Sequence, residues 1–286
     1  MRIVSFNGGK AGILINDKVL DVSKALKGIN FRNWANYKYV RNLIEQWDEI
    51  KILLERILKS KHVIEGFSYN LNDVSLDAPI TNPSKIICVG RNYMSHIEEM
   101  REEVPSEPIF FLKPPSALTG HNSKIILPAE SKRVDHEIEL AVIIGKRCKN
   151  VDPREAWSTI FGYTILLDIT ARDLQRKDVT WFRAKGFDTF CPLGPWIVTK
   201  DEIEDPQNLN IELKVNGKVR QQGNTKDMIF KINELIRFAS KVCTLEPGDI
   251  IATGTPKGVA PLKHGDIIEG YIEKIGSLKL AVNSFP

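Results

Sequence analysis

The chain has 286 residues, of which 42% are hydrophobic and 27% charged, and both fractions are ordinary for a globular protein with a large core. Its 40 basic and 36 acidic side chains are spread along the chain without a long block of one sign. That spread speaks against nucleic acid as a partner, and no apolar run approaches the roughly 18 residues that a membrane-spanning helix needs.

A small N-terminal α+β domain is predicted over residues 1–70. Three short strands come first, with turn sequences between them: residues 2–6, 11–15 and 18–22, separated by Asn7-Gly8-Gly9 and Asn16-Asp17. Residues 40–58 then follow the helical period and form one apolar stripe. Because such a stripe must be covered, we expect this helix to pack on the strands.

A mainly β second domain is predicted over residues 85–286, which places the chain in the α+β class. The preceding residues, 71–84, form a linker by composition, since they are rich in proline and turn-forming residues. The domain opens with a strand at Lys85–Gly90. Further on, Asn216-Gly217 between two strand patterns is typical of a hairpin with a type I′ turn.

A histidine and a carboxylate, His96 and Glu99, follow the first strand of the second domain. If this segment is helical, residues three apart share a face. A carboxylate fixes the tautomer of a neighbouring imidazole and raises its basicity, so the pair is a candidate general base. A purely structural pair of surface side chains is the alternative. The segment then runs into Pro105 and Pro108, which suits a mobile flap.

Two carboxylates, Glu137 and Glu139, lead into the apolar run of residues 140–144, which predicts a buried strand. Residues two apart on a strand point to the same face, so these side chains lie together at its start. Two buried anions this close need a cation or a proton. The alternative is a strand end whose glutamates are solvated or paired with Lys132 or Arg133.

A third carboxylate, Asp168, ends the core of another apolar strand pattern at residues 162–170. Three carboxylates at the ends of two buried strands form an all-oxygen site, which suits Mg²⁺ or Mn²⁺ better than zinc. Lys185, among small and aromatic neighbours, is a candidate functional amine near these anions, or else a lysine that reaches from the surface. The loop at residues 253–258 offers backbone N–H groups to an anion.

The cysteines and the N-terminus bear on the location of the protein. The four cysteines are far apart and show no metal-binding or disulfide spacing, which fits a reducing cytoplasm: Cys88, Cys148, Cys191 and Cys243. The N-terminus lacks the apolar segment of a signal peptide. We therefore expect a soluble cytoplasmic protein.

Together these segments resemble the fumarylacetoacetate hydrolase family. The similarity covers about two hundred residues from Lys85 onward and is carried by several motifs in the family's order: VGRNYMSHIEEM, FFLKPPSALTG, VDHEIELAVIIGKR, LDITARDLQ, RAKGFDTF with CPLGPW, LKVNGKVRQQGNT and LEPGDIIATGTPKGV. It implies a mixed β-roll catalytic domain, usually in a homodimer, with a divalent metal ion.

The resemblance also implies a role for nine residues. The metal ligands are Glu137, Glu139 and Asp168; the catalytic residues are His96 and Glu99 on a lid together with Lys185; the substrate-binding residues are Arg172, Gln175 and Thr255. The implied cofactor is Mg²⁺ or Mn²⁺, and the implied substrate is a small 2-oxo acid.

The sequence favours hydrolytic C–C cleavage of an acylpyruvate-like β-diketo acid through a metal-stabilised pyruvate enolate, because a complete His/Glu pair can activate water. Decarboxylation of oxaloacetate and isomerisation of 2-hydroxyhepta-2,4-diene-1,7-dioate use the same enolate chemistry and remain alternatives. A sugar-acid dehydratase is less favoured. A metal- or metabolite-binding protein without turnover is the alternative from a different class.

Overall fold

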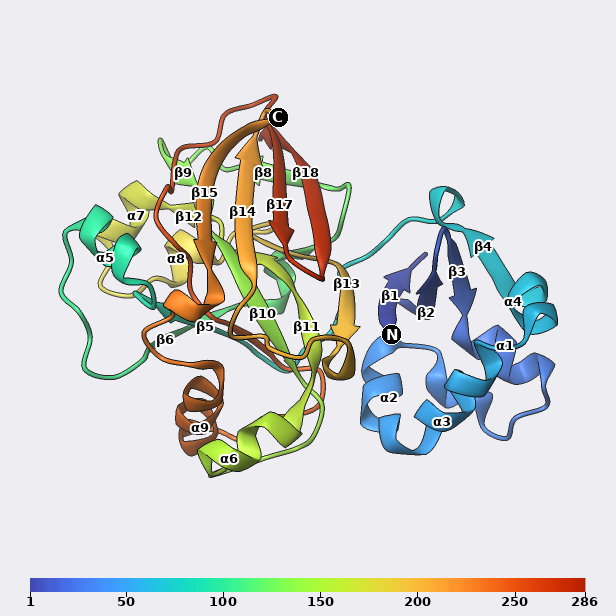
Figure 1. Cartoon of the computed structure of the whole chain (residues 1–286). Helices are drawn as coiled ribbons and strands as arrows, with labels where there is room; N and C mark the ends of the chain where they lie inside the picture. Colours follow the sequence, from blue (N-terminus) through green and yellow to red (C-terminus); the bar gives the residue numbers. More distant parts are fainter. Residues whose placement is uncertain (286) are drawn as a thin grey trace.

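The computed structural model describes residues 1–285, and its N-terminal elements lie beside a larger body (Figure 1). Four helices cover four short antiparallel strands there: β1 (Arg2–Phe6), β2 (Lys10–Ile15), β3 (Lys18–Asp21), β4 (Ser68–Asn70), α1 (Val22–Gly28), α2 (Val40–Glu45), α3 (Trp47–Ile57) and α4 (Lys61–Phe67). Leu20 of β3 and Leu54 of α3 belong to one buried cluster. The predicted packing of the apolar stripe on the strands is therefore confirmed.

The predicted single helix over residues 40–58 is wrong in one respect, because it is divided at Gln46. This residue has φ −111° and ψ 21°, and its N–H group bonds to both Asn42 O and Ile44 O, which tightens the chain into a new turn. The apolar stripe nevertheless stays on the buried side. Trp47, the first residue after the break, meets Phe161 with ring centroids 5.0 Å apart.

One sheet continues from the N-terminal strands into the larger body. β1 pairs antiparallel with β13 (Cys191–Thr199), with Arg2 opposite Val198 and Ile3 opposite Ile197. The predicted linker is also bound to this region, since the Asp77 side chain accepts hydrogen bonds from the N–H groups of Gly8 and Gly9.

The larger body is built from mixed sheets and short helices. The long sheet continues in the order β13-β11-β10-β16-β5-β6, with β7 beside β13, and a second sheet has the order β15-β14-β17-β18-β8. The strands are β5 (Ile86–Gly90), β6 (Ile109–Lys113), β7 (Leu118–Thr119), β8 (Lys124–Leu127), β9 (Val134–Asp135), β10 (Ile138–Ile144), β11 (Ile160–Leu167), β12 (Thr170–Ala171), β14 (Asn210–Val215), β15 (Lys218–Asn224), β16 (Ile250–Ala252), β17 (Ile267–Ile272) and β18 (Gly276–Ser284). The helices are α5 (Met94–Met100), α6 (Pro153–Ala156), α7 (Arg172–Lys177), α8 (Phe182–Lys185) and α9 (Ile232–Val242). The predicted α+β class with a mainly β second part is confirmed.

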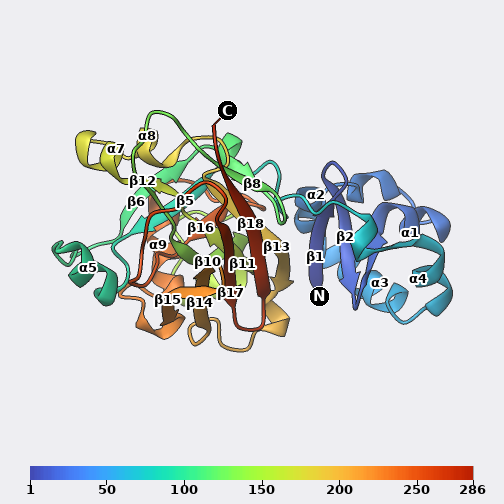
Figure 2. The same ribbon diagram turned by 90° about the horizontal axis from the view of Figure 1, so that it is seen from above.

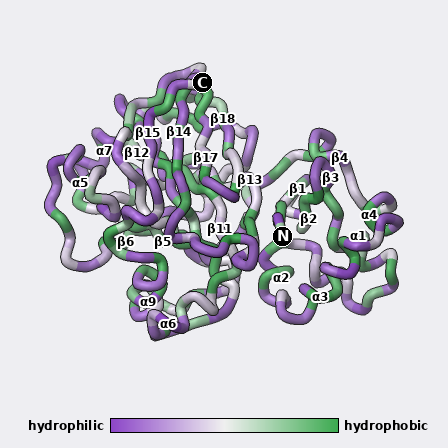
Figure 3. Tube along the Cα trace, viewed as in Figure 1, coloured by the Kyte–Doolittle hydropathy of each residue, from purple (hydrophilic) through white to green (hydrophobic). Residues whose placement is uncertain are grey.

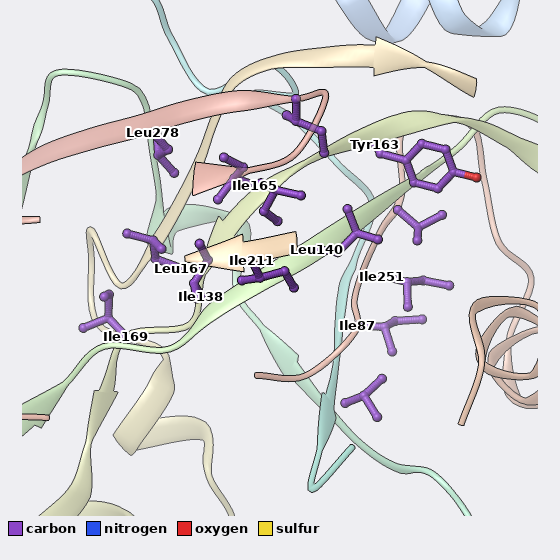
Figure 4. Close-up of a cluster of buried hydrophobic side chains, with 14 of the residues drawn as sticks. Ile87, Ile138, Leu140, Tyr163, Ile165, Leu167, Ile169, Ile211, Ile251 and Leu278 are labelled. Atoms are coloured by element: carbon purple, nitrogen blue, oxygen red, sulfur yellow. The ribbon is translucent and has the colours of Figure 1, made fainter. Parts of the chain in front are cut away.

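The main core lies between the two large sheets. Figure 4 shows Ile138 and Leu167 of the long sheet beside Ile211 and Leu278 of the second sheet, and all four belong to one buried cluster. Hydrophobic residues follow the inner strands, whereas the outer turns are mostly hydrophilic (Figure 3). This core fixes the ends of β10 and β11, where the predicted carboxylates lie.

Two views place α5 at the end of the molecule farthest from the N-terminal elements, near α7 and α8 (Figures 1 and 2). The predicted hairpin is confirmed, since Asn216 and Gly217 both adopt the positive φ that a type I′ turn requires, 52° and 74°. Within residues 1–285, no helix is both long and apolar enough to cross a membrane.

Candidate active site

The three predicted carboxylates meet at one end of the β10–β11 pair. Glu137 immediately precedes β10, Glu139 is its second residue, and Asp168 immediately follows β11. Ile138 lies opposite Leu167 in the antiparallel register, and the Asp168 N–H donates to Glu137 O at 2.8 Å. Each carboxylate offers one oxygen within 4.8 Å of the other two, and all three side chains are buried. The acid trio, as we call Glu137, Glu139 and Asp168, can therefore hold a metal ion.

Two buried lysines neutralise part of this charge. Lys185, the last residue of α8, places its Nζ 2.9 Å from Glu137 Oε2 and 2.5 Å from Asp168 Oδ2. Lys113, at the end of β6, donates to Asp168 Oδ1 at 2.6 Å and to Ile169 O at 3.2 Å. The sequence identified Lys185 but not Lys113. The signal for Lys113 was a lysine that ends an apolar strand directly before two prolines.

The charges around Glu137 and Glu139 shift the pKa values of these two glutamates in opposite directions. Burial alone would raise the pKa of Glu137, but Arg172 and Lys185 lower it far below its ordinary value. Burial, together with the negative charges of Asp168 and Glu137, instead raises the pKa of Glu139 well above its ordinary value. Burial and the two neighbouring negative charges therefore favour the protonated form of Glu139, whereas Arg172 and Lys185 favour the charged form of Glu137. Its Oε2 accepts a hydrogen bond of 2.8 Å from the Gly254 N–H.

The chemistry of this donor set fits a hard divalent cation. All three ligand groups are carboxylates, which Mg²⁺ and Mn²⁺ prefer. Glu139 makes no ion pair with a lysine or arginine within residues 1–285, although it is buried beside two other acids. A divalent ion would supply the positive charge that this carboxylate lacks.

The helix α5 covers the acid trio, and it confirms the predicted helical placement of His96 and Glu99. His96 Nε2 is 3.7 Å from Glu137 Oε1, and His96 Nδ1 is 3.6 Å from Glu99 Oε2. Glu99 in turn accepts the Gly258 N–H at 3.0 Å, which attaches α5 to the loop after β16. Burial lowers the pKa of His96 despite the nearby glutamates, so its imidazole is neutral at pH 7.

A cavity of about 310 Å³ lies between α5, α7 and the acid trio. Its aromatic wall consists of Phe111 and Trp181, whose rings meet edge to face with centroids 5.2 Å apart. A Cβ atom on Gly90 would approach Trp181 Cζ3 to 2.8 Å, so a side chain there would displace this wall. Ile97 and Met100 of α5 add apolar surface.

The three predicted substrate-binding residues all line this cavity: Arg172, Gln175 and Thr255. Arg172 binds Glu137 and also donates to Asp135 Oδ2 at 3.1 Å and to Gln175 Oε1 at 2.9 Å. Its guanidinium is thus largely engaged by protein groups. The Thr255 hydroxyl donates to Ile138 O at 2.7 Å.

Gln221, which the sequence did not identify, connects the acid trio to the Thr255 loop. Its Oε1 accepts from the Ile138 N–H at 3.1 Å and lies 2.9 Å from His136 Nδ1, while its Nε2 donates to Thr255 Oγ1 and to Pro256 O, both at 2.8 Å. Since His136 and Ile138 flank Glu137, one buried amide fixes both a carboxylate and the cavity wall. The only sequence signal was a glutamine pattern, Gln221-Gln222, after the hairpin.

Comparison with known proteins gives the following relations. Residues 85–283 match the family model described as fumarylacetoacetate (FAA) hydrolase C-terminal. The chain is 49% identical over 214 residues to the bovine protein named oxaloacetate tautomerase FAHD2A, mitochondrial, which covers 72% of this chain and 68% of that protein. An uncharacterized protein of Pyrococcus abyssi is 63% identical over 201 residues, or 69% of this chain and 89% of that protein.

Solved structures resemble the whole chain. Maleylpyruvate hydrolase from Sphingobium sp. SYK-6, in complex with manganese(II) and pyruvate, has a TM-score of 0.84 and 38% identity, with 100% of both chains covered. The 2-hydroxyhepta-2,4-diene-1,7-dioate isomerase from Mycobacterium marinum has a TM-score of 0.76 and 35% identity, with 99% of this chain and 98% of that chain covered.

Proposed function

The chain belongs to the fumarylacetoacetate hydrolase family, whose members are enzymes, and from this premise we propose that it is a Mg²⁺- or Mn²⁺-dependent hydrolase that cleaves a C–C bond of an acylpyruvate-like 2-oxo acid. One observation carries this proposal. His96 lies 3.7 Å from Glu137 with a neutral imidazole, so a base that can activate water is held directly above the acid trio.

The proposed roles follow from the geometry. Glu137, Glu139 and Asp168 would hold the ion, which would act as a Lewis acid toward the 2-oxo acid end of the substrate. His96 takes a proton from water, and Glu99 stabilises the imidazolium that forms. The water attacks the distal carbonyl carbon, the C–C bond breaks to give a carboxylic acid and the enolate of pyruvate, and His96 returns its proton to the enolate carbon.

The leaving group in this reaction is the enolate of pyruvate. The Lys185 ammonium, which is buried beside the acid trio, stabilises the negative charge that develops on it. Burial favours the neutral amine, but Asp168 and Glu137 raise the pKa of Lys185, so this group keeps its charge. The relative that is solved in complex with manganese(II) and pyruvate supports a divalent ion and a pyruvate-like ligand for this chain.

Oxaloacetate chemistry is the second candidate, favoured by the 49% identity to the bovine oxaloacetate tautomerase. Tautomerisation needs only proton transfers, which His96 can perform without attacking water. Decarboxylation of oxaloacetate passes through the same enolate. The similarity to the M. marinum isomerase keeps 2-hydroxyhepta-2,4-diene-1,7-dioate isomerisation as a further alternative.

Product analysis tests these proposals. The purified chain with Mg²⁺ or Mn²⁺ is incubated with acetylpyruvate or oxaloacetate, and products are identified by NMR. We expect acetate and pyruvate from acetylpyruvate, with the reaction lost after EDTA. Glu99→Gln should slow it, whereas Glu98→Gln, on the exposed side of α5, should not. Turnover of oxaloacetate alone would favour the second candidate, and ligand-induced stabilisation without any product would indicate a binding protein.

We propose further that residues 1–70 and 85–286 are two domains joined by residues 71–84, and that two copies of the chain form a dimer. Support for a dimer comes from the segment that leads into α8, where Val179 is fully exposed and Phe182, the first residue of α8, is 65% exposed. Apolar side chains in such positions often lie at an interface. The cytoplasmic location stays a prediction. Sedimentation velocity of the wild type and of Phe182→Ser tests the dimer.

A further inference from the structure

The segment between α8 and β13 contains an unusual backbone conformation. Thr189 has φ +68°, and among residues 1–285 it is the only β-branched residue with a positive φ. A side chain branched at Cβ crowds the backbone in this conformation, so threonine rarely adopts it. The Phe190 N–H donates to Phe187 O at 3.1 Å, which closes a β-turn with Thr189 at its third position. A type II turn has a positive φ at this position and favours glycine or asparagine there.

The Thr189 hydroxyl attaches this turn to the second sheet. Its oxygen accepts the Ile126 N–H at 2.8 Å. Ile126 belongs to β8, which is the last strand of that sheet, so in the described part of the chain no further strand pairs with its outer side. Glycine at position 189 would suit the backbone of the turn, but it would leave this N–H group without its acceptor. The strained residue therefore makes a contact that the residue best suited to the turn could not make.

The main chain of the same turn supports a carboxylate of the acid trio. Phe190 O accepts the N–H of Ile169 at 3.1 Å, and Ile169 directly follows Asp168. Phe190 is fully buried, and its ring meets that of Phe187 with centroids 5.2 Å apart. The turn is thus fixed on β8 by a hydroxyl, beside Asp168 by a carbonyl, and in the core by an aromatic ring.

Lys185 has little else to hold it on the side of the chain that follows it. The helix α8, which ends at Lys185, comprises only four residues, and a single helical turn is not stable without support from its surroundings. The Lys185 Nζ nevertheless lies 2.9 Å from Glu137 Oε2 and 2.5 Å from Asp168 Oδ2. A rigid turn that begins two residues after Lys185 restricts how far this ammonium can move from the two carboxylates.

We propose that Thr189 is a positioning residue for Lys185, although it is not among the residues that line the cavity. This inference rests on the proposed function, because it takes Lys185 to stabilise the charge of the enolate. The contacts of the turn with β8 and with the core over-determine the strained conformation. Without the hydroxyl contact the turn can relax, and the ammonium then lies farther from the charge that develops in the reaction.

Two variants at this position test the role by kinetics. Thr189→Val keeps the shape and the branching of the side chain but removes the acceptor, whereas Thr189→Ser keeps the hydroxyl. With Mn²⁺ and acetylpyruvate, Thr189→Val should lower kcat by about tenfold or more and leave KM within about twofold, because the enolate charge develops only in the transition state. Thr189→Ser should keep kcat within about threefold of the wild-type value. If only oxaloacetate is turned over, it replaces acetylpyruvate in these assays.

Lys274→Val is the matched control. Lys274 is exposed and also has a positive φ, 64°, at the third position of a turn that the Ile275 N–H closes on Ile272 O, but this turn joins β17 to β18. The substitution should lower the free energy of unfolding, measured by urea denaturation, and leave kcat unchanged. It thereby separates an effect on Lys185 from a general loss of stability.

Oxalate, a stable analogue of the pyruvate enolate, gives a measurement that needs no turnover. In calorimetry, the Mn²⁺-loaded Thr189→Val protein should bind oxalate about tenfold more weakly than the wild type. On a Lys185→Met background the same substitution should change the oxalate Kd by less than about twofold, because no ammonium is left to position. If Lys185→Met does not fold, the comparison of Thr189→Val with Thr189→Ser decides.

The outcomes for the two proposals can be told apart. Unchanged kcat and oxalate affinity in Thr189→Val would overturn the positioning role, and turnover by the wild type would leave the proposed function in place. An equal loss of oxalate affinity with and without Lys185 would also overturn it. If the wild type consumes no 2-oxo acid, the proposed function fails, and the oxalate titrations still decide whether Thr189 positions Lys185.

Discussion

The cavity has two regions, the buried acid trio with its lysines, which we call the depth, and the covering helix α5, which we call the roof. The two regions differ in whether their polar groups have protein partners. In the depth, each oxygen of Asp168 has its own lysine, and Glu137 has both Arg172 and Lys185. In the roof, formed by α5, the His96 Nδ1 has no hydrogen-bond partner within residues 1–285.

This difference distinguishes the part of the site that is complete once the chain has folded from the part that still has polar groups free for a ligand. Buried charges are costly unless they are paired, so the depth must be assembled with the core around it. The roof keeps polar groups without a protein partner, even though His96 is buried, and it leaves their hydrogen-bonding capacity for a ligand. Changes in the depth should therefore lower the stability of the protein, whereas changes in the roof should lower activity alone.

The largest expected effect is in the depth, at Lys113. Lys113→Met removes a fully buried cation and leaves Asp168 with one lysine, so we expect the free energy of unfolding to fall by about 3 kcal/mol in EDTA. Urea denaturation measures this loss. Mn²⁺ should restore part of it, because the ion supplies the missing positive charge. Lys124→Met, at an exposed position of β8, is the control, and equal stability of the two variants would contradict the prediction.

A roof substitution should behave in the opposite way. His96→Asn should reduce kcat for acetylpyruvate by about 10²-fold or more, because it removes the base that activates water. The free energy of unfolding and the Kd for Mn²⁺ should remain close to the wild-type values, since His96 is not one of the three carboxylate ligands. His62→Asn on exposed α4 is the matched control. A large loss of Mn²⁺ affinity in His96→Asn would show that roof and depth are not separate.

Gln221 joins the start of β10 to the Thr255 loop in the cavity wall, so its removal should affect both stability and substrate binding. Gln221→Leu leaves a buried N–H group of β10 and the Thr255 loop without their partner, which should cost about 1–3 kcal/mol of stability. It should also raise the KM for the substrate, because Thr255 lines the cavity. Gln222→Leu changes the exposed neighbour and should do neither. A stability loss with an unchanged KM would limit Gln221 to a role in the depth.

The smallest expected effect is the release of a proton when the acid trio binds a metal ion. Burial and the two neighbouring negative charges raise the pKa of Glu139, which favours its protonated form in the metal-free protein, whereas a metal ion binds the deprotonated form. Metal binding should therefore release a proton, and affinity should weaken as the pH falls, by at most about tenfold per pH unit. Calorimetry in two buffers of different ionisation enthalpy measures this release. Glu139→Gln should abolish it, and a wild-type titration without proton release would contradict the prediction.

The sequence predicts the acid trio well because strand periodicity is a local property. Glu137 and Glu139 alternate with buried residues of one strand, and Asp168 marks the end of the next, so the apolar pattern alone brings them to adjacent ends. Lys113 and Gln221 were not predicted, because their roles depend on long-range contacts and not on a local pattern. Each meets the site through contacts with residues that are distant in the sequence, and neither lies in a local pattern that distinguishes it from a surface side chain.

The predicted linker and single N-terminal helix show the same limit. The proline-rich composition of residues 71–84 indicates irregular backbone, which the structure has, but not that Asp77 binds the turn at Gly8 and Gly9. The division of the helix at Gln46 likewise accompanies the contact of Trp47 with Phe161, which lies on a strand of the larger body. Local pattern gives the element, and long-range packing decides where it bends.

The pairing of β1 with β13 has a consequence for shortened forms of this protein. The backbone of Thr199 donates to Met1 O at 2.9 Å, and the α-amino group of Met1 lies 2.7 Å from Glu202. A chain that started at Lys85 would keep every cavity residue named above but would expose the last residues of β13 as an open, apolar sheet edge. Such edges recruit strands from other molecules, so this fragment should precipitate rather than lose its chemistry. By pairing with β13, β1 thus covers a sheet edge that would otherwise be open to strands of other molecules.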